Sequence, residues 1–217
     1  MTERETFFRQ RETMVERQIK ARGIRDPALL DAMREVPREL FVPEKYHAAA
    51  YDDAPLPIPA KQTISQPYVV ALMIHALNLD RDDRVLEVGS GSGYASAILR
   101  RMVCEVHAVE RHLVLVEYAR ERLQKAGYDN VHVHHADGTM GWPDAAPYDG
   151  ILVSASGPRV PAALETQLAI GGSLVMPIGR ARGMQTLIRL TRLSEDDYRE
   201  RDMGGVRFVP LIGQEGW

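Results

Sequence analysis

The sequence predicts an α/β fold built on a mostly parallel, doubly wound sheet with an antiparallel edge. From residue 84 onward, short β-branched runs alternate with amphipathic runs, which is typical of parallel strands joined by helices that cover both faces of a sheet. A glycine-rich loop follows the first of these runs. Two further β-type runs, TLIRLTRL and VRFVPLI, lie close together near the C-terminus and fit antiparallel strands added at one sheet edge.

The first third of the chain predicts helices and an irregular connection. Apolar residues recur at roughly helical spacing among charges over about residues 3–22, which predicts an amphipathic helix. Asp26-Pro27 predicts the start of a second, short helix, because proline is favoured in the first helical turn. The chain then holds five prolines from Pro37 to Pro59, which predicts an irregular wrap before an apolar helix that runs from Pro67 to about Leu77.

The alternating region predicts five strands and three connecting helices. The expected strands are RVLEVG, EVHAVE, NVHVHHAD, YDGILVSAS and GGSLVMPIG. The expected helices are YASAILRRM, a segment from about Leu113 to Lys125 that ends near Gly127, and one that opens near Pro161. We expect an N-terminal helical segment and wrap over residues 1–62, a ligand-binding core over 63–180, and a β extension of the same domain over 181–217.

Composition limits the class of protein. The chain has 217 residues, a net charge of -3 and a pI of about 6.2, which argues against a nucleic-acid binder that works by bulk positive charge. The first residues are charged and lack the apolar core of a signal peptide, and no run approaches a membrane span. The single cysteine, Cys104, excludes an internal disulfide and fits a reducing compartment; we expect its thiol to be buried. These features predict a cytoplasmic monomer without nucleic-acid or membrane partners.

The glycine-rich loop predicts a ligand site. In open α/β sheets, ligands bind beyond the carboxyl ends of the strands. Gly89, Gly91 and Gly93 follow the first strand, where they let the backbone approach a ligand and place it near a helix N-terminus that attracts anions. A dinucleotide-binding loop of the form G-x-G-x-x-G would need a small residue at position 94, but Tyr94 stands there. This disfavours NAD.

Acidic residues at successive strand ends indicate which kind of ligand this site binds. Glu87 closes the first strand, and Glu110 closes the second, 17 residues after Gly93, where a carboxylate can accept both ribose hydroxyls. Asp137-Gly138 ends the third strand, a suitable place for an acidic group near an adenine amine. The combination resembles S-adenosylmethionine-dependent methyltransferases. The alternatives are a structural role for Glu87 beside helix N–H groups and a simple turn at Asp137-Gly138.

Two other signals narrow the chemistry. His132, His134 and His135 lie within a strand pattern without cysteines or further acidic ligands at metal spacing, so we expect no metal site there. Methyltransferases that act on nucleic-acid amines often carry an Asn/Asp-Pro-Pro-aromatic motif after the fourth strand, where this chain reads VSASG. The acceptor is therefore not expected to be a base amine.

The segment QTISQPY, at residues 62–68, leads to one family. With DDAPLPI before it and VLEVGSGSGYASAIL, HADGTMGWPDAAPYDGILVSAS and GGSLVMPIG after it, it resembles the protein-L-isoaspartate O-methyltransferases. The resemblance runs from about Pro37 to the C-terminal VRFVPLIGQEGW and implies a Rossmann-like methyltransferase fold. Two departures stand out: Ala60-Lys61 and Ala136 occupy positions where the family often has glycine.

The resemblance also implies an activity. Enzymes of this family transfer a methyl group from S-adenosylmethionine, without a metal, to the free α-carboxylate of an isoaspartyl residue in a damaged protein or peptide. The ester closes to a succinimide, which reopens in part to normal aspartate. The resemblance assigns the active-site serine to Ser65 and acceptor binding to Thr63, Ile64, Ser65 and Gln66. The alternative is that Thr63 or Ser65 only caps the helix that begins at Pro67.

Three other functions remain open from the sequence. A methyltransferase acting on a small-molecule acid or hydroxyl would keep the glycine loop but ignore isoaspartyl peptides. A nucleoside-binding module would bind the cofactor and transfer nothing. An NAD oxidoreductase would need a different residue in place of Tyr94.

Overall fold

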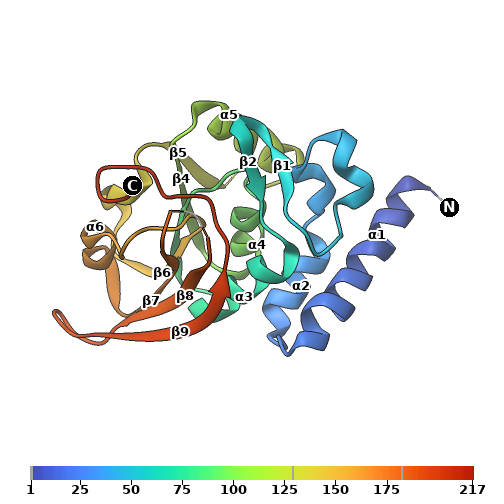
Figure 1. The fold of residues 1–217 in the computed structure, drawn as a ribbon. Coiled ribbons are helices and arrows are strands. Elements are labelled where there is room, and N and C mark those ends of the chain that lie inside the picture. Colours follow the sequence, from blue (N-terminus) through green and yellow to red (C-terminus); the bar gives the residue numbers. More distant parts are fainter. Residues whose placement is uncertain (1, 129, 182) are drawn as a thin grey trace.

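A computed structural model describes residues 2–128, 130–181 and 183–217. Its centre is a seven-stranded sheet with the strand order β5-β4-β3-β6-β7-β8-β9. The first five strands in this order are parallel, and β8 and β9 are antiparallel, as the sequence predicts. Figure 1 shows this sheet on one side of the molecule and the N-terminal helices on the other.

The strands follow the β-branched runs of the sequence. Buried valines, leucines and isoleucines fill the central strands on both faces, as expected where helices or loops cover both sides of a sheet. The strands are β3 (Arg84–Val88), β4 (Glu105–Glu110), β5 (Val131–His135), β6 (Tyr148–Val153), β7 (Leu168–Gly179), β8 (Gln185–Arg192) and β9 (Tyr198–Val206).

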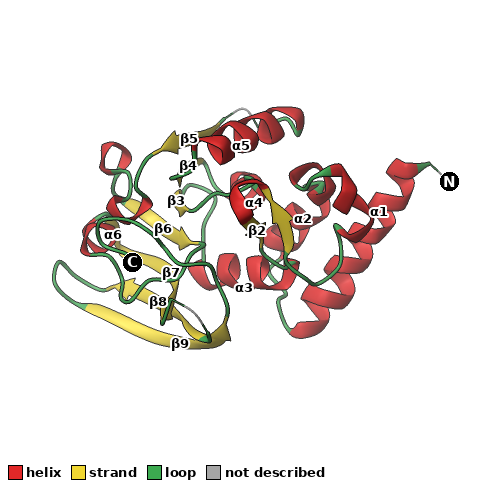
Figure 2. Ribbon diagram, turned by 45° about the horizontal axis from the view of Figure 1, so that its top comes forward, coloured by secondary structure: helices red, strands yellow, loops and turns green. Residues whose placement is uncertain are grey.

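The helices form two layers, and each layer closes one hydrophobic core. One core joins one face of the sheet to α3 (Pro67–Leu77), α4 (Tyr94–Met102) and α5 (Leu113–Lys125). The smaller core, on the other face, includes Leu164 of α6 (Ala162–Thr166). These helices agree with the expected ones (Figure 2). Among the described residues, no helix is long and apolar enough to cross a membrane.

The N-terminal region packs onto the first of these cores. The predicted first helix is a continuous helical segment: α1 (Glu3–Met14) passes into a π-helical turn (Val15–Ile19) and a 3₁₀ turn (Lys20–Arg22). The second predicted helix is α2 (Pro27–Glu35), whose first backbone N–H groups donate to the Asp26 carboxylate. After the wrap, β1 (Leu56–Ile58) pairs antiparallel with β2 (Gln62–Ile64), so the expected division between residues 62 and 63 lies inside β2.

Two expectations about the chain were wrong. The run VRFVPLI is not the last strand: β9 is the preceding, mostly polar segment, and the chain from 207 to 212 is extended loop with one isolated bridge from Pro210 to Ser156. The apolar run instead crosses the carboxyl ends of the strands, where it lines the cavity described below. Cys104 is exposed, not buried, because it lies in the turn before β4, where its thiol contacts the carbonyls of Asp82 and Asp83.

Candidate functional site

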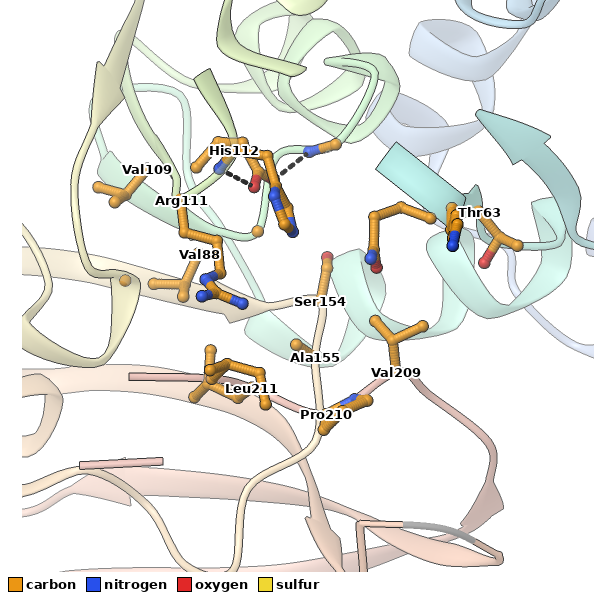
Figure 3. Close-up of a pocket in the computed structure, with 17 residues that line it drawn as sticks. Thr63, Val88, Val109, Arg111, His112, Ser154, Ala155, Val209, Pro210 and Leu211 are labelled. Atoms are coloured by element: carbon orange, nitrogen blue, oxygen red, sulfur yellow. Dashed lines mark hydrogen bonds between the residues drawn. The ribbon is translucent and has the colours of Figure 1, made fainter. Parts of the chain in front are cut away.

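A cavity of about 310 Å³ lies at the carboxyl ends of β3, β4 and β6 (Figure 3). This volume lies at the lower end of the range for small-molecule sites. Its walls come from the loops after these strands, the hairpin β1–β2 and the C-terminal segment. The lining residues are Lys61, Gln62, Thr63, Val88, Gly89, Gly91, Val109, Glu110, Arg111, His112, Gly138, Ser154, Ala155, Val209, Pro210, Leu211 and Ile212.

The predicted glycines have different tasks around this cavity. Gly89 and Gly91 line it with positive φ angles of 81° and 54°, which glycine adopts without steric cost. Gly138 lines it as well, and a side chain there would meet the Val88 side chain at 2.6 Å. Gly93 instead begins α4 in the left-handed region, and an added Cβ would press on Leu123 of α5 at 3.2 Å. Gly93 therefore serves helix packing.

Glu110 is placed as the sequence predicts, with its carboxylate in the lining of the cavity. Its Oε2 accepts a hydrogen bond from the Gly91 backbone N–H at 3.1 Å, and its Oε1 accepts one from the His112 N–H at 2.9 Å. Figure 3 draws both bonds as dashed lines. A carboxylate has about four acceptor positions, so each oxygen keeps capacity for one more donor. This arrangement could bind two neighbouring hydroxyl groups.

Glu87 lies beside the cavity, in a smaller one of about 50 Å³ that also touches Ser65. Its side chain is 1% exposed and accepts a hydrogen bond from the Ser96 hydroxyl. Burial, with a smaller contribution from the nearby Glu110 carboxylate, raises the pKa of Glu87 to about 8. The side chain is therefore mainly protonated at neutral pH, and it can donate a hydrogen bond as well as accept one.

The carboxylate of Asp137 already accepts hydrogen bonds from other residues of the chain. Its Oδ1 accepts from the Thr139 N–H and hydroxyl at 2.9 and 2.8 Å, and its Oδ2 accepts from the Gln214 N–H at 2.8 Å. These hydrogen bonds to the charged form lower the pKa of Asp137 against the opposing effect of partial burial. Asp137 fastens the C-terminal segment over the cavity, while the adjacent Gly138 supplies the lining. Its contact with an adenine amine stays a prediction.

A second cavity of about 240 Å³ adjoins the first and contains most of the predicted acceptor residues. Thr63, Ser65 and Gln66 line it, whereas Ile64 is buried at 5% exposure in the larger core. Thr63 also lines the first cavity, as do Ser154 and Val209. The two cavities therefore share a wall, at the point where Figure 3 shows Thr63, Ser154 and Val209 facing one open space.

A buried arginine binds the backbone of the loop that carries Ser65. Arg38 is fully buried, and its guanidinium donates to the Ala50 carbonyl at 2.7 Å and to the Ser65 carbonyl at 2.8 Å. It also lies 4.7 Å from the centre of the Tyr94 ring. Because the backbone of Ser65 is fixed through its carbonyl, its side chain stays available to the second cavity.

The helix after the loop does not use the loop's hydroxyls as caps. Gln66 is the N-cap residue of α3 and its side chain makes no capping bond within the described chain. The Tyr68 N–H in the first turn donates instead to Asp53 Oδ1 at 3.1 Å, from the wrap. This finding contradicts the alternative that Ser65 serves as the helix cap.

The departure from glycine at residues 60 and 61 carries a conformational cost. Ala60 and Lys61 have φ angles of 56° and 58°, in the left-handed region that favours glycine. A non-glycine residue there costs roughly 1–2 kcal/mol. The loop before Thr63 is therefore held in a turn that its own side chains disfavour.

Three charged or titratable residues that line the cavities were not among those predicted from the sequence. Arg111 and His112 follow Glu110, and Figure 3 shows their side chains projecting toward the first cavity. Arg207 lines the second cavity from the C-terminal segment. The position directly after the second strand could have indicated Arg111 and His112, whereas Arg207 lies in VRFVPLI, whose apolar pattern predicts a strand.

Known proteins resemble the chain over nearly its whole length. The profile of the protein-L-isoaspartate(D-aspartate) O-methyltransferase family matches residues 9–216. A Rhodopseudomonas palustris relative called protein-L-isoaspartate O-methyltransferase is 57% identical over 204 residues, 94% of each chain. A solved protein-L-isoaspartate O-methyltransferase is 29% identical with a TM-score of 0.84, over 95% of this chain and 67% of the other.

A further structure adds a ligand. A Plasmodium falciparum protein of the same description, solved in complex with S-adenosyl-L-homocysteine, is 26% identical with a TM-score of 0.80, over 93% of this chain and 98% of its own. The family profile, the close relative and both structures confirm the resemblance that QTISQPY and the glycine loop indicated. The chain belongs to the protein-L-isoaspartate(D-aspartate) O-methyltransferase family.

Proposed function

We propose that this protein transfers a methyl group from S-adenosylmethionine to the free α-carboxylate of isoaspartyl residues in damaged proteins and peptides, and so initiates their repair through a succinimide. The observation that carries the proposal is the shared wall of the two cavities, made of Thr63, Ser154 and Val209. Methyl transfer needs a donor and an acceptor that are both bound and aligned at close range. Family membership supports the choice of donor and acceptor.

The first cavity fits a nucleoside cofactor. Gly89 and Gly91 allow close approach of the backbone, and Glu110 offers two carboxylate oxygens that backbone N–H groups already orient. Val88, Val109 and Leu211 supply apolar walls, as a purine ring requires. We assign ribose binding to Glu110 and the adenine region to the neighbourhood of Asp137-Gly138.

The acceptor needs no general base. A carboxylate with an ordinary pKa near 4 is already an anion at neutral pH, so the protein has only to aim one oxygen and exclude water. Bound S-adenosylmethionine would supply an electrophilic methyl group at its sulfonium. We assign to the Ser65 hydroxyl a hydrogen bond to the acceptor carboxylate, and Arg207 adds a positive charge to the same cavity.

Protonation of Glu87 supports the same chemistry. Its side chain shares the small cavity with Ser65, to which we assign acceptor binding. Since burial raises the pKa of Glu87 to about 8, most molecules carry no negative charge there at neutral pH. An acceptor anion in the second cavity therefore avoids a carboxylate charge in the small cavity beside Ser65.

The test compares two acceptors that differ in one linkage. The protein is incubated with S-adenosylmethionine labelled in its methyl group and either an isoaspartyl peptide or its normal aspartyl twin. We expect a base-labile methyl ester on the isoaspartyl peptide and nearly none on the twin. Equal labelling of both would indicate a general carboxyl methyltransferase. Binding of S-adenosylhomocysteine without labelling of either would indicate a nucleoside-binding module.

We also propose that the protein acts as a cytoplasmic monomer. The exposed thiol of Cys104 fits a reducing compartment, and the proposed acceptors are other proteins that must reach the second cavity. Light scattering after size exclusion is expected to give the mass of one chain, 24.3 kDa. A mass of twice that value would contradict the monomer.

A further inference from the structure

Three histidines gather on the face of β4 and β5 that is turned away from α4 and α5, at the sheet edge formed by β5. His107 on β4 and His132 on β5 are register partners, and their rings are stacked with centroids 4.9 Å apart. His134 lies two residues further along β5, with its ring 5.4 Å from that of His107. Glu105 completes the group from the start of β4.

We propose that Glu105, His107 and His132 form a binding site for a divalent transition-metal ion of the Zn²⁺ type. One ligand atom from each residue lies within 4.8 Å of the other two. Imidazole and carboxylate are suitable ligands for Zn²⁺, and three protein ligands leave one position of a tetrahedral ion for water. The inference concerns a part of the sheet away from both cavities and does not depend on the proposed methyl transfer.

The geometry is close to what the ion needs. Without an ion, the His107 Nε2–H donates to Glu105 Oε1 at 2.9 Å, so a bound ion would take the place of the proton between these two atoms. Ligand atoms around a tetrahedral Zn²⁺ are about 3.3 Å apart, given bonds of about 2.0–2.1 Å. These two atoms therefore need to separate only slightly, whereas the exposed side chain of His132 can rotate inward to complete the set.

The surrounding residues hold the ligands as outer partners of metal sites do. Arg84 Nε donates to Glu105 Oε2 at 2.7 Å, which leaves Oε1 to face His107. His107 Nδ1 lies 3.1 Å from His134 Nε2. When an ion binds, His107 releases the Nε2 proton that it donates to Glu105, carries its ring proton on Nδ1 toward His134, and presents the Nε2 lone pair to the ion. Such a bond from the second nitrogen is the usual support for a ligating histidine.

His107 and His134 are in turn fixed by packing. The His107 side chain is about 10% exposed and lies edge-on to Tyr148, with centroids 6.1 Å apart. The His134 ring stacks on Trp142 with centroids 3.8 Å apart. His107, one of the three proposed ligands, and its outer partner His134 are therefore held in place before any ion binds, which limits the entropy lost on binding. The sequence pattern gives no signal for such a site, because Glu105 and His107 lie 25 or more residues from the other histidines.

The experiment is calorimetry with Zn²⁺ on the full chain, prepared without a histidine tag and first treated with a chelator. We expect one Zn²⁺ per chain. His132→Gln is expected to weaken binding at least tenfold, and the outer variant His134→Phe about 10- to 100-fold. His75→Gln is the matched control, because His75 is an exposed histidine on α3, and it is expected to bind like the wild type.

A second readout separates a metal site from a structural cluster. Co²⁺ bound in a tetrahedral site gives visible absorption, which we expect for the wild type and not for His132→Gln. Without metal, His132→Gln is expected to melt like the wild type, because its side chain is exposed. Failure of the wild type to bind one Zn²⁺, or equal affinity of the wild type and His132→Gln, would overturn the proposal. Methyl transfer by His132→Gln is expected to be normal, so the two proposals fail independently.

Discussion

Ser65 and Asp53 lie on either side of the entrance to α3, and substitution of each tests a different role. If the Ser65 hydroxyl binds the acceptor, Ser65→Ala removes one hydrogen bond to a charged group, worth about 1.5–3 kcal/mol. This corresponds to a loss of about ten- to a hundredfold in kcat/KM for the isoaspartyl peptide. The stability is expected to change little, because Asp53 and not Ser65 binds the Tyr68 N–H.

The loss should appear mainly in KM. An acceptor anion and a sulfonium cation combine into neutral products, so charge fades as the transition state forms. A hydrogen bond to the carboxylate is therefore stronger in the bound ground state than in the transition state. It contributes mainly to binding and orienting the acceptor. The affinity for S-adenosylhomocysteine is expected to stay the same in Ser65→Ala.

Asp53→Ala is expected to show the opposite pattern. It removes the bond to the first turn of α3, worth about 1 kcal/mol, and a half-exposed ion pair with Arg22, worth about 0–1 kcal/mol. Urea unfolding should therefore show a loss of about 1–2 kcal/mol. Asp52→Ala is the control, since the Asp52 side chain is exposed. An early-melting Ser65→Ala with normal kinetics at low temperature would refute the acceptor role.

Three other substitutions have expected outcomes. Glu110→Ala should weaken S-adenosylhomocysteine binding by about 1.5–3 kcal/mol in calorimetry, and an unchanged affinity would remove Glu110 from the ribose. Arg38→Met leaves the Ala50 and Ser65 carbonyls unpaired and should lower the free energy of urea unfolding by about 2–4 kcal/mol. A change below about 1 kcal/mol would show that Arg38 does not hold the loop of Ser65. Because the pKa of Glu87 is raised from 4.5 to about 8, its contribution to stability is present below pH 4.5 and is lost as the pH rises through 8. Relative to Glu87→Gln, the wild type should lose up to about 1 kcal/mol per pH unit between pH 5 and 8, whereas a constant difference would contradict the raised pKa.

The sheet could be predicted because its central strands are buried on both faces. β3 (RVLEV) and β6 (YDGILV) contain short buried runs of β-branched and aliphatic residues, and loops with glycine and polar residues follow them. The edge strand β9 gave no such signal. Its sequence, YRERDMGGV, is mostly exposed, since it pairs on one side with β8 and has few buried neighbours. The apolar run directly after it, and not β9 itself, therefore carries the sequence pattern of a strand.

The strand-end residues could be predicted for a related reason. Chain order and the parallel sheet together place Gly89, Glu110 and Gly138 at one edge, whatever the details of packing. The residues that position them could not be found in this way. Arg38 meets Ser65 across 27 residues, and Asp53 meets Tyr68 across 15. Such contacts depend on how the proline-rich wrap folds back, which no local pattern describes.

The C-terminal segment explains why the apolar run VRFVPLI is not in the sheet. The Ser156 N–H donates to the Val209 carbonyl, and the Leu211 N–H donates to the Ser156 carbonyl, both at 2.8 Å, so the segment is tied to the loop after β6. Asp137 binds it again through the Gln214 N–H. Held at both points, Val209 separates the two cavities and contacts each of them. The segment's apolar side chains thus serve as the inner wall of the site, where excluding water strengthens every electrostatic contact with a bound anion.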